Sequence, residues 1–193
     1  MSIKKSSYIP LLGVAAKFVN VFEPVSKFGS KPKYGAQFLI SNNDPQLLKL
    51  QEAVDTLAAE AFPGVKKVAS PLRDGNTQKD TEKYPEYKNS VFVEASTQFP
   101  PEVLDSDKSK LSPDDDPFAD GVIVNGIIHF VSYDLGPKKG VTAVLDSIQF
   151  WERGKKLRSQ IAMPELPCRS TEVCSVTENS STENTGSDEL LGW

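Results

Sequence analysis

Hydrophobic residues at alternate positions mark most of the regular structure expected in this chain. The alternation is loose over residues 13–23 and regular from Tyr34 to Ile40, where apolar side chains occupy every second position. Residues 90–96, 122–133 and 141–151 are three further stretches of strand-like pattern. Within the last stretch the apolar positions change phase near Asp146 and Ser147, which predicts a β-bulge. The pattern therefore predicts about five strands.

A single helix is expected between the second and third of these strands. Asp44 is a plausible N-cap, Pro45 suits the first helical position, and apolar residues recur at helical spacing up to Ala61. Pro63 and Gly64 then end the helix. Because one helix accompanies about five strands without regular strand–helix alternation, we expect a mostly β, five-stranded antiparallel barrel of the OB type.

Two long segments, residues 71–88 and 100–120, lack a periodic pattern and are expected to be loops. Loops of this length in compact domains are usually functional or disordered. The strand between them carries Val91, Val93 and Ala95 on one face, and Phe92 with polar neighbours on the other. This pattern predicts that the Phe92 ring is not a simple core side chain.

The last thirty residues differ in composition from the rest of the chain. Residues 164–193 are rich in Ser, Thr, Glu and Asn, and they cannot bury enough apolar surface to offset the entropy of ordering. We therefore expect a domain over residues 1–163 and a disordered acidic tail over residues 164–193. The tail ends on residues expected to bind a partner protein: Asp188, Glu189, Leu190, Leu191 and Trp193.

Charge is unevenly distributed between the two regions. The net charge is −4, and the tail holds six acidic residues and one basic residue, so the body is close to +1. Such a division is a hint of nucleic-acid binding. Cys168 and Cys174 both lie in the tail, so no disulfide is expected in the domain. Together with the lack of a convincing signal peptide or membrane-spanning run, this favours a cytoplasmic location.

The motifs that accompany common enzyme chemistries are missing. The sequence contains neither a glycine-rich phosphate-binding loop nor a nucleophile elbow, and His129 is its only histidine. Asp114–Asp116 could in principle bind Mg²⁺, but three consecutive carboxylates point in different directions and are better explained as a solvated loop. We therefore expect no enzyme activity, no metal site and no cofactor.

Cationic and aromatic residues are interleaved through the loops and strand edges. Single-strand binding needs this pairing, because cations follow the phosphates and flat rings stack on unpaired bases. The candidate DNA-binding residues are Lys31, Lys33, Tyr34, Arg73, Lys79, Tyr84, Tyr87, Lys88, Phe92, Lys138 and Lys139, with Tyr84, Tyr87 and Phe92 as stacking candidates.

Four short motifs follow one another along the chain: Tyr34-Gly35-Ala36, Arg73-Asp74-Gly75-Asn76-Thr77, Tyr84-Pro85-Glu86-Tyr87-Lys88 and Lys139-Gly140-Val141-Thr142-Ala143. In this order they resemble a family of bacteriophage single-stranded DNA-binding proteins. The resemblance covers most of residues 8–160. It implies an OB-type fold, an acidic tail with a terminal aromatic residue, and a role in replication, recombination and repair. Related tails often end in Phe, so the terminal Trp193 is a departure that could alter the choice of partner.

Three hypotheses follow from the sequence. The first is a sequence-tolerant single-stranded DNA-binding protein in the cytoplasm of an infected bacterium. In it the acidic tail competes with DNA for a cationic groove and, once displaced, recruits a polymerase, helicase or nuclease. The second is a non-enzymatic scaffold or inhibitor that binds a protein through an OB-like barrel. The third is a metal-dependent nuclease that uses Asp114–Asp116.

Overall fold

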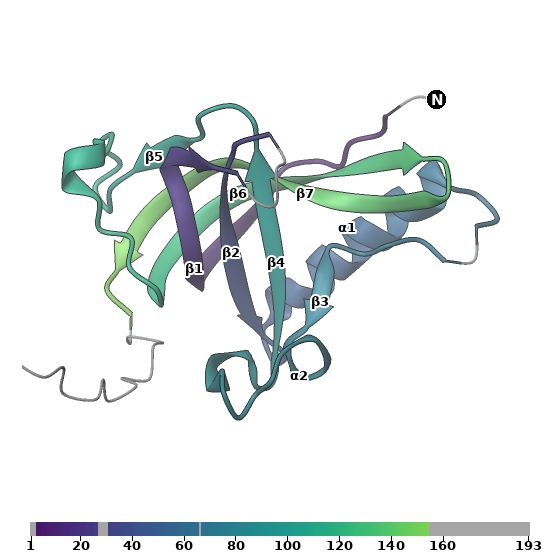
Figure 1. Cartoon of the computed structure of the whole chain (residues 1–193), viewed down its shortest axis with the longest axis horizontal. Helices are drawn as coiled ribbons and strands as arrows, with labels where there is room; N and C mark the ends of the chain where they lie inside the picture. The colour runs from purple at the N-terminus through teal and green to yellow at the C-terminus, as the bar shows by residue number, and fades with distance from the viewer. Residues whose placement is uncertain (1–2, 27–30, 66, 155–193) are drawn as a thin grey trace, which may run out of the picture. The chain divides into compact units, whose positions relative to one another are not determined.

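A computed structural model describes residues 3–26, 31–65 and 67–154. Seven strands, two short 3₁₀ helices and two α-helices are found there (Figure 1). In chain order they are β1 (Ile9–Val25), β2 (Lys33–Ser41), α1 (Pro45–Ala61), β3 (Leu72–Asp74), α2 (Gly75–Gln78), η1 (Pro85–Tyr87), β4 (Ser90–Thr97), β5 (Glu102–Leu104), η2 (Pro113–Asp115), β6 (Val122–Leu135) and β7 (Lys138–Glu152).

Five of the strands close into a barrel. β1 pairs antiparallel with β2 and with β6, β2 pairs with β4, and β6 pairs with β7. A parallel pairing of Ala95 in β4 with Ala143 in β7 closes the ring. The expected OB-like barrel is confirmed.

The barrel interior is filled by the face of each strand that points inward. Phe38, Phe130, Ile128 and Leu145 are among its largest fully buried side chains. Burial of such side chains contributes roughly 1.5–3 kcal/mol each. They make the barrel a packed core, so any binding surface must lie on its outside.

Helix α1 forms where the apolar periodicity predicts it. The Asp44 carboxylate accepts a hydrogen bond from the Gln46 backbone N–H at 2.9 Å, so the expected N-cap is confirmed. Leu50, Val54 and Leu57 are buried and belong to the main core cluster. Among the described residues, no helix has the length and hydropathy needed to cross a membrane.

The predicted β-bulge in the last strand is also confirmed. Ile127 of β6 pairs with Ser147, whereas the next residue, Ile128, pairs with Leu145. Asp146 is therefore the extra residue of β7 at this point. A bulge bends a strand and increases its twist, as the closing of a small barrel requires.

The two segments expected to be loops contain short regular elements. Residues 71–88 include β3, α2 and η1, and residues 100–120 include β5 and η2. β3 adds to the outer edge of β4, and β5 pairs in parallel with β7. The prediction of unbroken loops is wrong because these elements are only three or four residues long and carry no detectable period.

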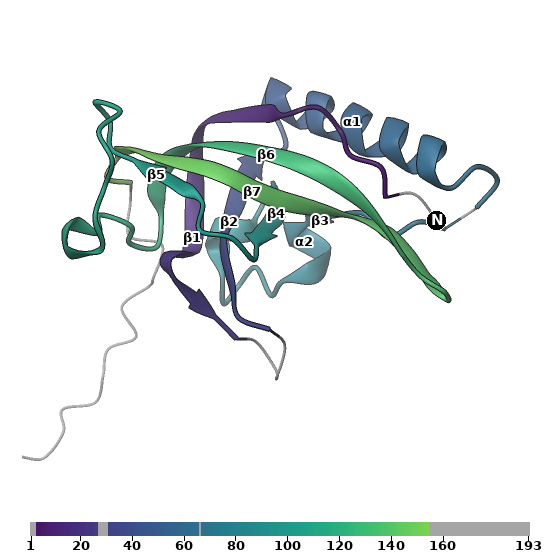
Figure 2. The same ribbon diagram turned by 90° about the horizontal axis from the view of Figure 1, so that it is seen from above.

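Two extensions of paired strands border the outer surface of the barrel. The paired strands β6 and β7 run beyond the barrel as a long hairpin (Figure 2). On another side, β1 bends strongly before it pairs with the start of β2, and its register shifts twice between Lys17 and Val25. These two extensions set the position of the site described next.

Candidate nucleic-acid interface

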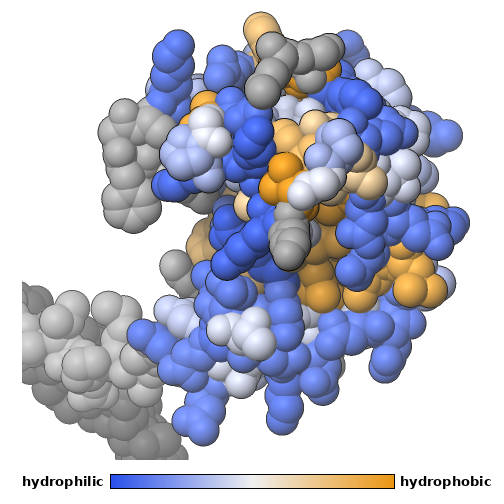
Figure 3. Space-filling view, turned by 90° about the vertical axis from the view of Figure 1, so that its right-hand side faces the viewer, coloured by the Kyte–Doolittle hydropathy of each residue, from blue (hydrophilic) through white to orange (hydrophobic). Residues whose placement is uncertain are grey.

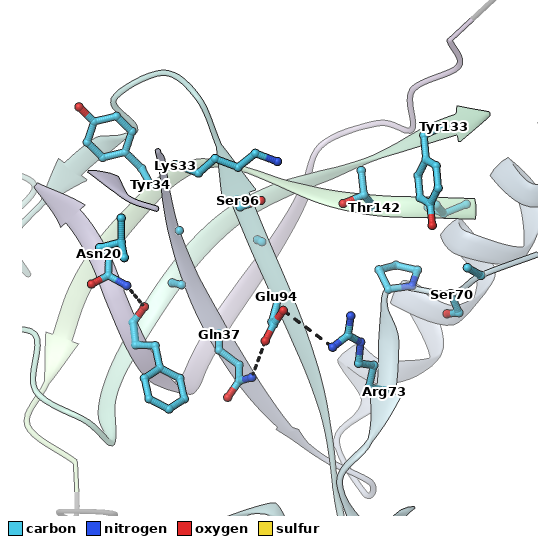
Figure 4. Close-up of a pocket in the computed structure, with 18 residues that line it drawn as sticks. Asn20, Lys33, Tyr34, Gln37, Ser70, Arg73, Glu94, Ser96, Tyr133 and Thr142 are labelled. Carbon is cyan, nitrogen blue, oxygen red and sulfur yellow. Dashed lines mark hydrogen bonds and ion pairs between the residues drawn. The ribbon is translucent and has the colours of Figure 1, made fainter. Parts of the chain in front are cut away.

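A groove of about 370 Å³ lies on the outer surface of the barrel. Its walls and floor come from β1, β2, β4, the segment at residues 69–73 and the β6–β7 hairpin (Figure 4). The side chains that line it include Phe18, Lys33, Tyr34, Arg73, Glu94 and Tyr133. Aromatic and cationic residues from separate parts of the chain thus meet in one concave surface.

A chain of polar contacts fixes the floor of the groove. The Tyr87 hydroxyl donates a hydrogen bond to Gln37 Oε1, and Gln37 Nε2 donates to Glu94 Oε1 at 3.2 Å. Arg73 Nη1 lies 3.9 Å from the other carboxylate oxygen of Glu94 (Figure 4). The floor is therefore held in one arrangement, with the Arg73 guanidinium half exposed at its end.

Two glycines determine how closely the walls of the groove approach. A Cβ on Gly35 would lie 2.7 Å from the Ala95 carbonyl oxygen, so only glycine fits between β2 and β4 without a shift. A Cβ on Gly140 would lie 2.5 Å from the Tyr133 hydroxyl and 2.8 Å from Ala69 Cβ. Because glycine leaves that space empty, the Tyr133 ring packs against β7 beside the groove.

The remaining part of the same outer face is covered by residues 75–89. Leu39, Tyr87 and Phe92 form a second buried cluster there, separate from the barrel core. The Tyr87 and Phe92 rings meet edge to face with centroids 5.3 Å apart. Burial raises the pKa of Tyr87 to about 12, and the nearby Glu86 and Glu94 carboxylates add to this shift.

The expectation that Tyr87 and Phe92 stack on DNA bases is therefore wrong. Only 2% of Tyr87 and 1% of Phe92 is exposed, so neither ring has a face that a base could cover. The physical reason is that the segment 75–89 folds over β4 and gives its outer face a second core. Alternation within β4 alone cannot indicate this cover, because the covering residues lie in a segment without a period.

Three other candidates lie on this covering segment without lining the groove. Lys79 Nζ lies 5.5 Å from the Tyr87 ring centroid and 5.6 Å from that of Phe92. Tyr84 is 40% exposed, and Lys88 is exposed. The buried Lys17 ammonium lies between this segment and the groove, 5.9 Å from the Tyr84 centroid and 5.3 Å from the Phe18 centroid.

Lys138 and Lys139 lie at the tip of the β6–β7 hairpin. Lys139 Nζ binds the Asp134 carboxylate at 2.9 Å, and this hydrogen bond holds the Asp134 pKa below its usual value. Lys139 lines a separate cavity of about 430 Å³ with Lys4 and Phe62. Figure 3 shows the side of the molecule that lies at the right in Figure 1, where the hairpin tip is found. Hydrophobic surface lies among hydrophilic residues on this side.

Of the predicted DNA-binding residues, Lys33, Tyr34 and Arg73 thus lie together in the groove, and their contact with DNA stays a prediction. Lys31 is exposed two residues before β2. The predicted partner-binding residues lie outside the described part of the chain, as does the whole predicted tail; they are Asp188, Glu189, Leu190, Leu191 and Trp193.

The groove has two further aromatic residues, Phe18 and Tyr133, which were not predicted from the sequence. Both occur within stretches that read as ordinary strands, where an aromatic side chain suggests core packing. The loose alternation around Phe18 was the available signal, because it marks the point where the β1 register shifts. Tyr133 had a weaker signal, its place three residues before the hairpin turn at Gly136.

Asp114–Asp116, the candidate Mg²⁺ ligands, are exposed at η2 and do not line the groove. In the described ranges, no group of three or more His, Cys, Asp or Glu side chains is placed to hold a metal ion.

Comparison with known proteins gives a family match over most of the chain. A family model described as the ssDNA-binding protein of Enterobacter phage Enc34 matches residues 9–165. Protein p50 of Acyrthosiphon pisum secondary endosymbiont phage 1 is 29% identical over 159 residues, which span 76% of this chain and 84% of that protein.

Solved structures of two phage proteins share the fold. The single-stranded DNA-binding protein from bacteriophage Enc34 in complex with ssDNA matches with a TM-score of 0.68 and 19% identity, over 78% of this chain and 89% of that one. The single-stranded DNA-binding protein gp2.5 encoded by bacteriophage T7 matches with a TM-score of 0.53 and 14% identity, over 88% and 99% of the two chains.

Proposed function

The chain belongs to the family of phage ssDNA-binding proteins represented by that of Enterobacter phage Enc34, and on this premise we propose that it binds single-stranded DNA in the groove. The observation that carries the proposal is the meeting of Lys33 and Arg73 with Tyr34 and Tyr133 in one concave surface. Cations attract the phosphates of a single strand, and ring faces attract its unpaired bases regardless of sequence.

The charges along the groove support a proposal for how a strand would lie in it. Glu94 is 45% exposed there, and its carboxylate repels a phosphate that comes close. Lys33 is exposed at the start of β2, and the Arg73 guanidinium lies at the end of the floor contacts. We therefore place the bases toward the floor and the phosphates along the rim, near these two cations.

Titration of the full chain with DNA tests the proposal. A fluorescently labelled oligo-dT is expected to bind more tightly than a duplex of the same length, because the aromatic side chains need unpaired bases. The affinity is also expected to fall with salt, by about 0.7 in the slope of log K against log salt for each phosphate neutralised. Equal affinity for both substrates, or no binding to either, would reject the proposal and favour a protein-binding barrel.

The acidic tail, residues 164–193, is proposed to compete with DNA for the groove. Its net charge near −5 is opposite in sign to the charges of Lys33 and Arg73 and attracts the tail to them. A covalent tether gives even a weak interaction of this kind a high effective concentration. DNA would then release Leu190, Leu191 and Trp193 to recruit a polymerase, helicase or nuclease.

Deletion of residues 164–193 is expected to tighten binding to oligo-dT most strongly at low salt. Unchanged affinity across a salt series would reject the competition.

The wider role follows from these two activities. We propose that the protein coats single strands during phage DNA replication, recombination and repair in the cytoplasm of the infected bacterium. It acts by binding alone, without catalysis.

An assay for cleavage of labelled single and double strands in Mg²⁺ is expected to show intact substrate. Reproducible cleavage that survives purification of the protein would revive the nuclease hypothesis.

A further inference from the structure

Phe18 adopts a backbone conformation that is unusual for its residue type. Its φ is +50°, in the left-handed region that favours glycine, and steric crowding of Cβ makes this conformation unfavourable for a bulky side chain. It lies at the first register shift in the pairing of β1 with β2, between Lys17 and Asn20. A strained residue of this kind persists only when its surroundings hold it.

Side chains from two segments hold Phe18 in place. The Phe18 backbone N–H donates a hydrogen bond to Asp120 Oδ1 at 3.3 Å, and its carbonyl accepts one from Asn20 Nδ2 at 3.0 Å (Figure 4). The preceding residue is fixed as well, because Lys17 forms a buried ion pair with Glu86. Both peptide groups of Phe18 are thus satisfied in the left-handed conformation.

The result of this conformation is an aromatic ring at the groove. Phe18 lines the groove that Lys33 and Arg73 also line, and half of the residue is exposed. Phe38, by contrast, is fully buried in the barrel. A phenylalanine ring offers no hydrogen bond, so its exposed surface is suited to contact with another apolar or flat group.

We propose that Phe18 is a base-stacking residue of the groove and that the bulge in β1 serves to present it. This inference rests on the proposed binding of single-stranded DNA and names the residue that contacts its bases. Glycine would adopt the same φ without strain, so the presence of Phe in this conformation indicates that the ring has a use there. Stacking of a base on such a ring is tolerant of sequence.

Replacement of the ring provides the test. Phe18→Gly is expected to weaken binding to oligo-dT about tenfold, which corresponds to about 1.4 kcal/mol. The substitution suits the left-handed backbone, so the thermal unfolding midpoint is expected to be retained. Phe18→Leu keeps an apolar side chain without a flat ring and is expected to bind as weakly as Phe18→Gly. Phe18→Trp keeps a stacking face and is expected to bind at least half as tightly as the unchanged chain.

An abasic oligonucleotide of the same length separates stacking from other effects. The unchanged chain and Phe18→Gly are expected to bind this probe equally, since it carries phosphates without bases. Tyr8→Ala is the matched control, because Tyr8 is 69% exposed and does not line the groove, and it is expected to bind oligo-dT normally.

The possible outcomes distinguish the inference from the function on which it rests. If the unchanged chain binds oligo-dT and both Phe18→Gly and Phe18→Leu bind it equally well, Phe18 is not a stacking residue. An equal loss on the abasic probe would also overturn the inference, because the ring would then act on groove shape. If the unchanged chain binds no single strand, the proposed function fails and this inference fails with it.

Discussion

Lys17 and Glu86 form an ion pair beside the groove, with only 6% and 5% of their side chains exposed. Removal of one partner leaves the other charge buried without compensation, which typically costs about 3–5 kcal/mol. We therefore expect Lys17→Met to lower the free energy of unfolding by about 3 kcal/mol in urea denaturation. The double variant Lys17→Met with Glu86→Leu is the control and is expected to recover much of that loss. A single variant as stable as the unchanged chain would show that the pair has no structural role.

Tyr87 gives stability a dependence on high pH. Its pKa is about 12 in the folded protein and near 10 in the unfolded chain, because burial disfavours the phenolate. Between these two values the unfolded state releases the proton and the folded state keeps it, so stability falls as pH rises from 10 to 12. Urea denaturation across this range is expected to show a shallower decline for Tyr87→Phe. Identical pH profiles for the two proteins would exclude Tyr87 as the group responsible.

Single residues were predicted well where their role depends on nearby sequence. Asp44 could be identified as a helix cap because a cap interacts with the next two or three residues. Phe92 was misjudged because its burial depends on Tyr87, which belongs to a different element. The conformation of Phe18 could not be predicted, since the partner that binds its backbone N–H, Asp120, lies 102 residues away.

Between β3 and β4, Gly75 lets the covering segment approach the barrel. A Cβ on this residue would lie 2.2 Å from the Tyr87 carbonyl oxygen and 2.8 Å from that of Ser90, both backbone atoms that cannot turn aside. We therefore expect Gly75→Ala to destabilise the protein by more than about 2 kcal/mol in thermal or urea unfolding, a size typical of overpacked sites.

A second glycine variant serves as the control for this prediction. Gly64 has nothing within 4 Å of an added Cβ, although its φ is +79°. Gly64→Ala is therefore expected to cost only the strain of placing a Cβ in the left-handed region, about 1–2 kcal/mol. If the two variants are equally stable, close packing at Gly75 is not what requires glycine there.

Elements with a clear period were predicted correctly, and elements without one were missed. All five barrel strands and α1 each extend over at least eight residues, which is enough for a pattern to show. β3, α2 and β5 are only three or four residues long. They form because they pair with or pack on longer strands, and this information lies in the tertiary structure.

At the scale of the whole domain, the barrel could be inferred from strand number and the scarcity of helices. The position of the groove could not be inferred, because it depends on how β1 bends and how far the β6–β7 hairpin extends. Lys33, Tyr34 and Arg73 were predicted to bind DNA together in one cationic groove, and folding places them beside Phe18 and Tyr133, which were not predicted. Lys138 and Lys139 were grouped with them by composition alone and lie at the hairpin tip instead.

If single-stranded DNA lies in this groove, reversal of the charge of one groove residue must weaken DNA binding. Lys33→Glu changes a groove residue, whereas Lys49→Glu makes the same change on exposed α1 surface that does not line the groove. At low salt, Lys33→Glu is expected to weaken binding of a labelled oligo-dT by about tenfold or more and to reduce the salt slope by about 0.7, with Lys49→Glu close to the unchanged chain. Equal affinities and salt slopes for the two variants would show that the strand does not lie in this groove.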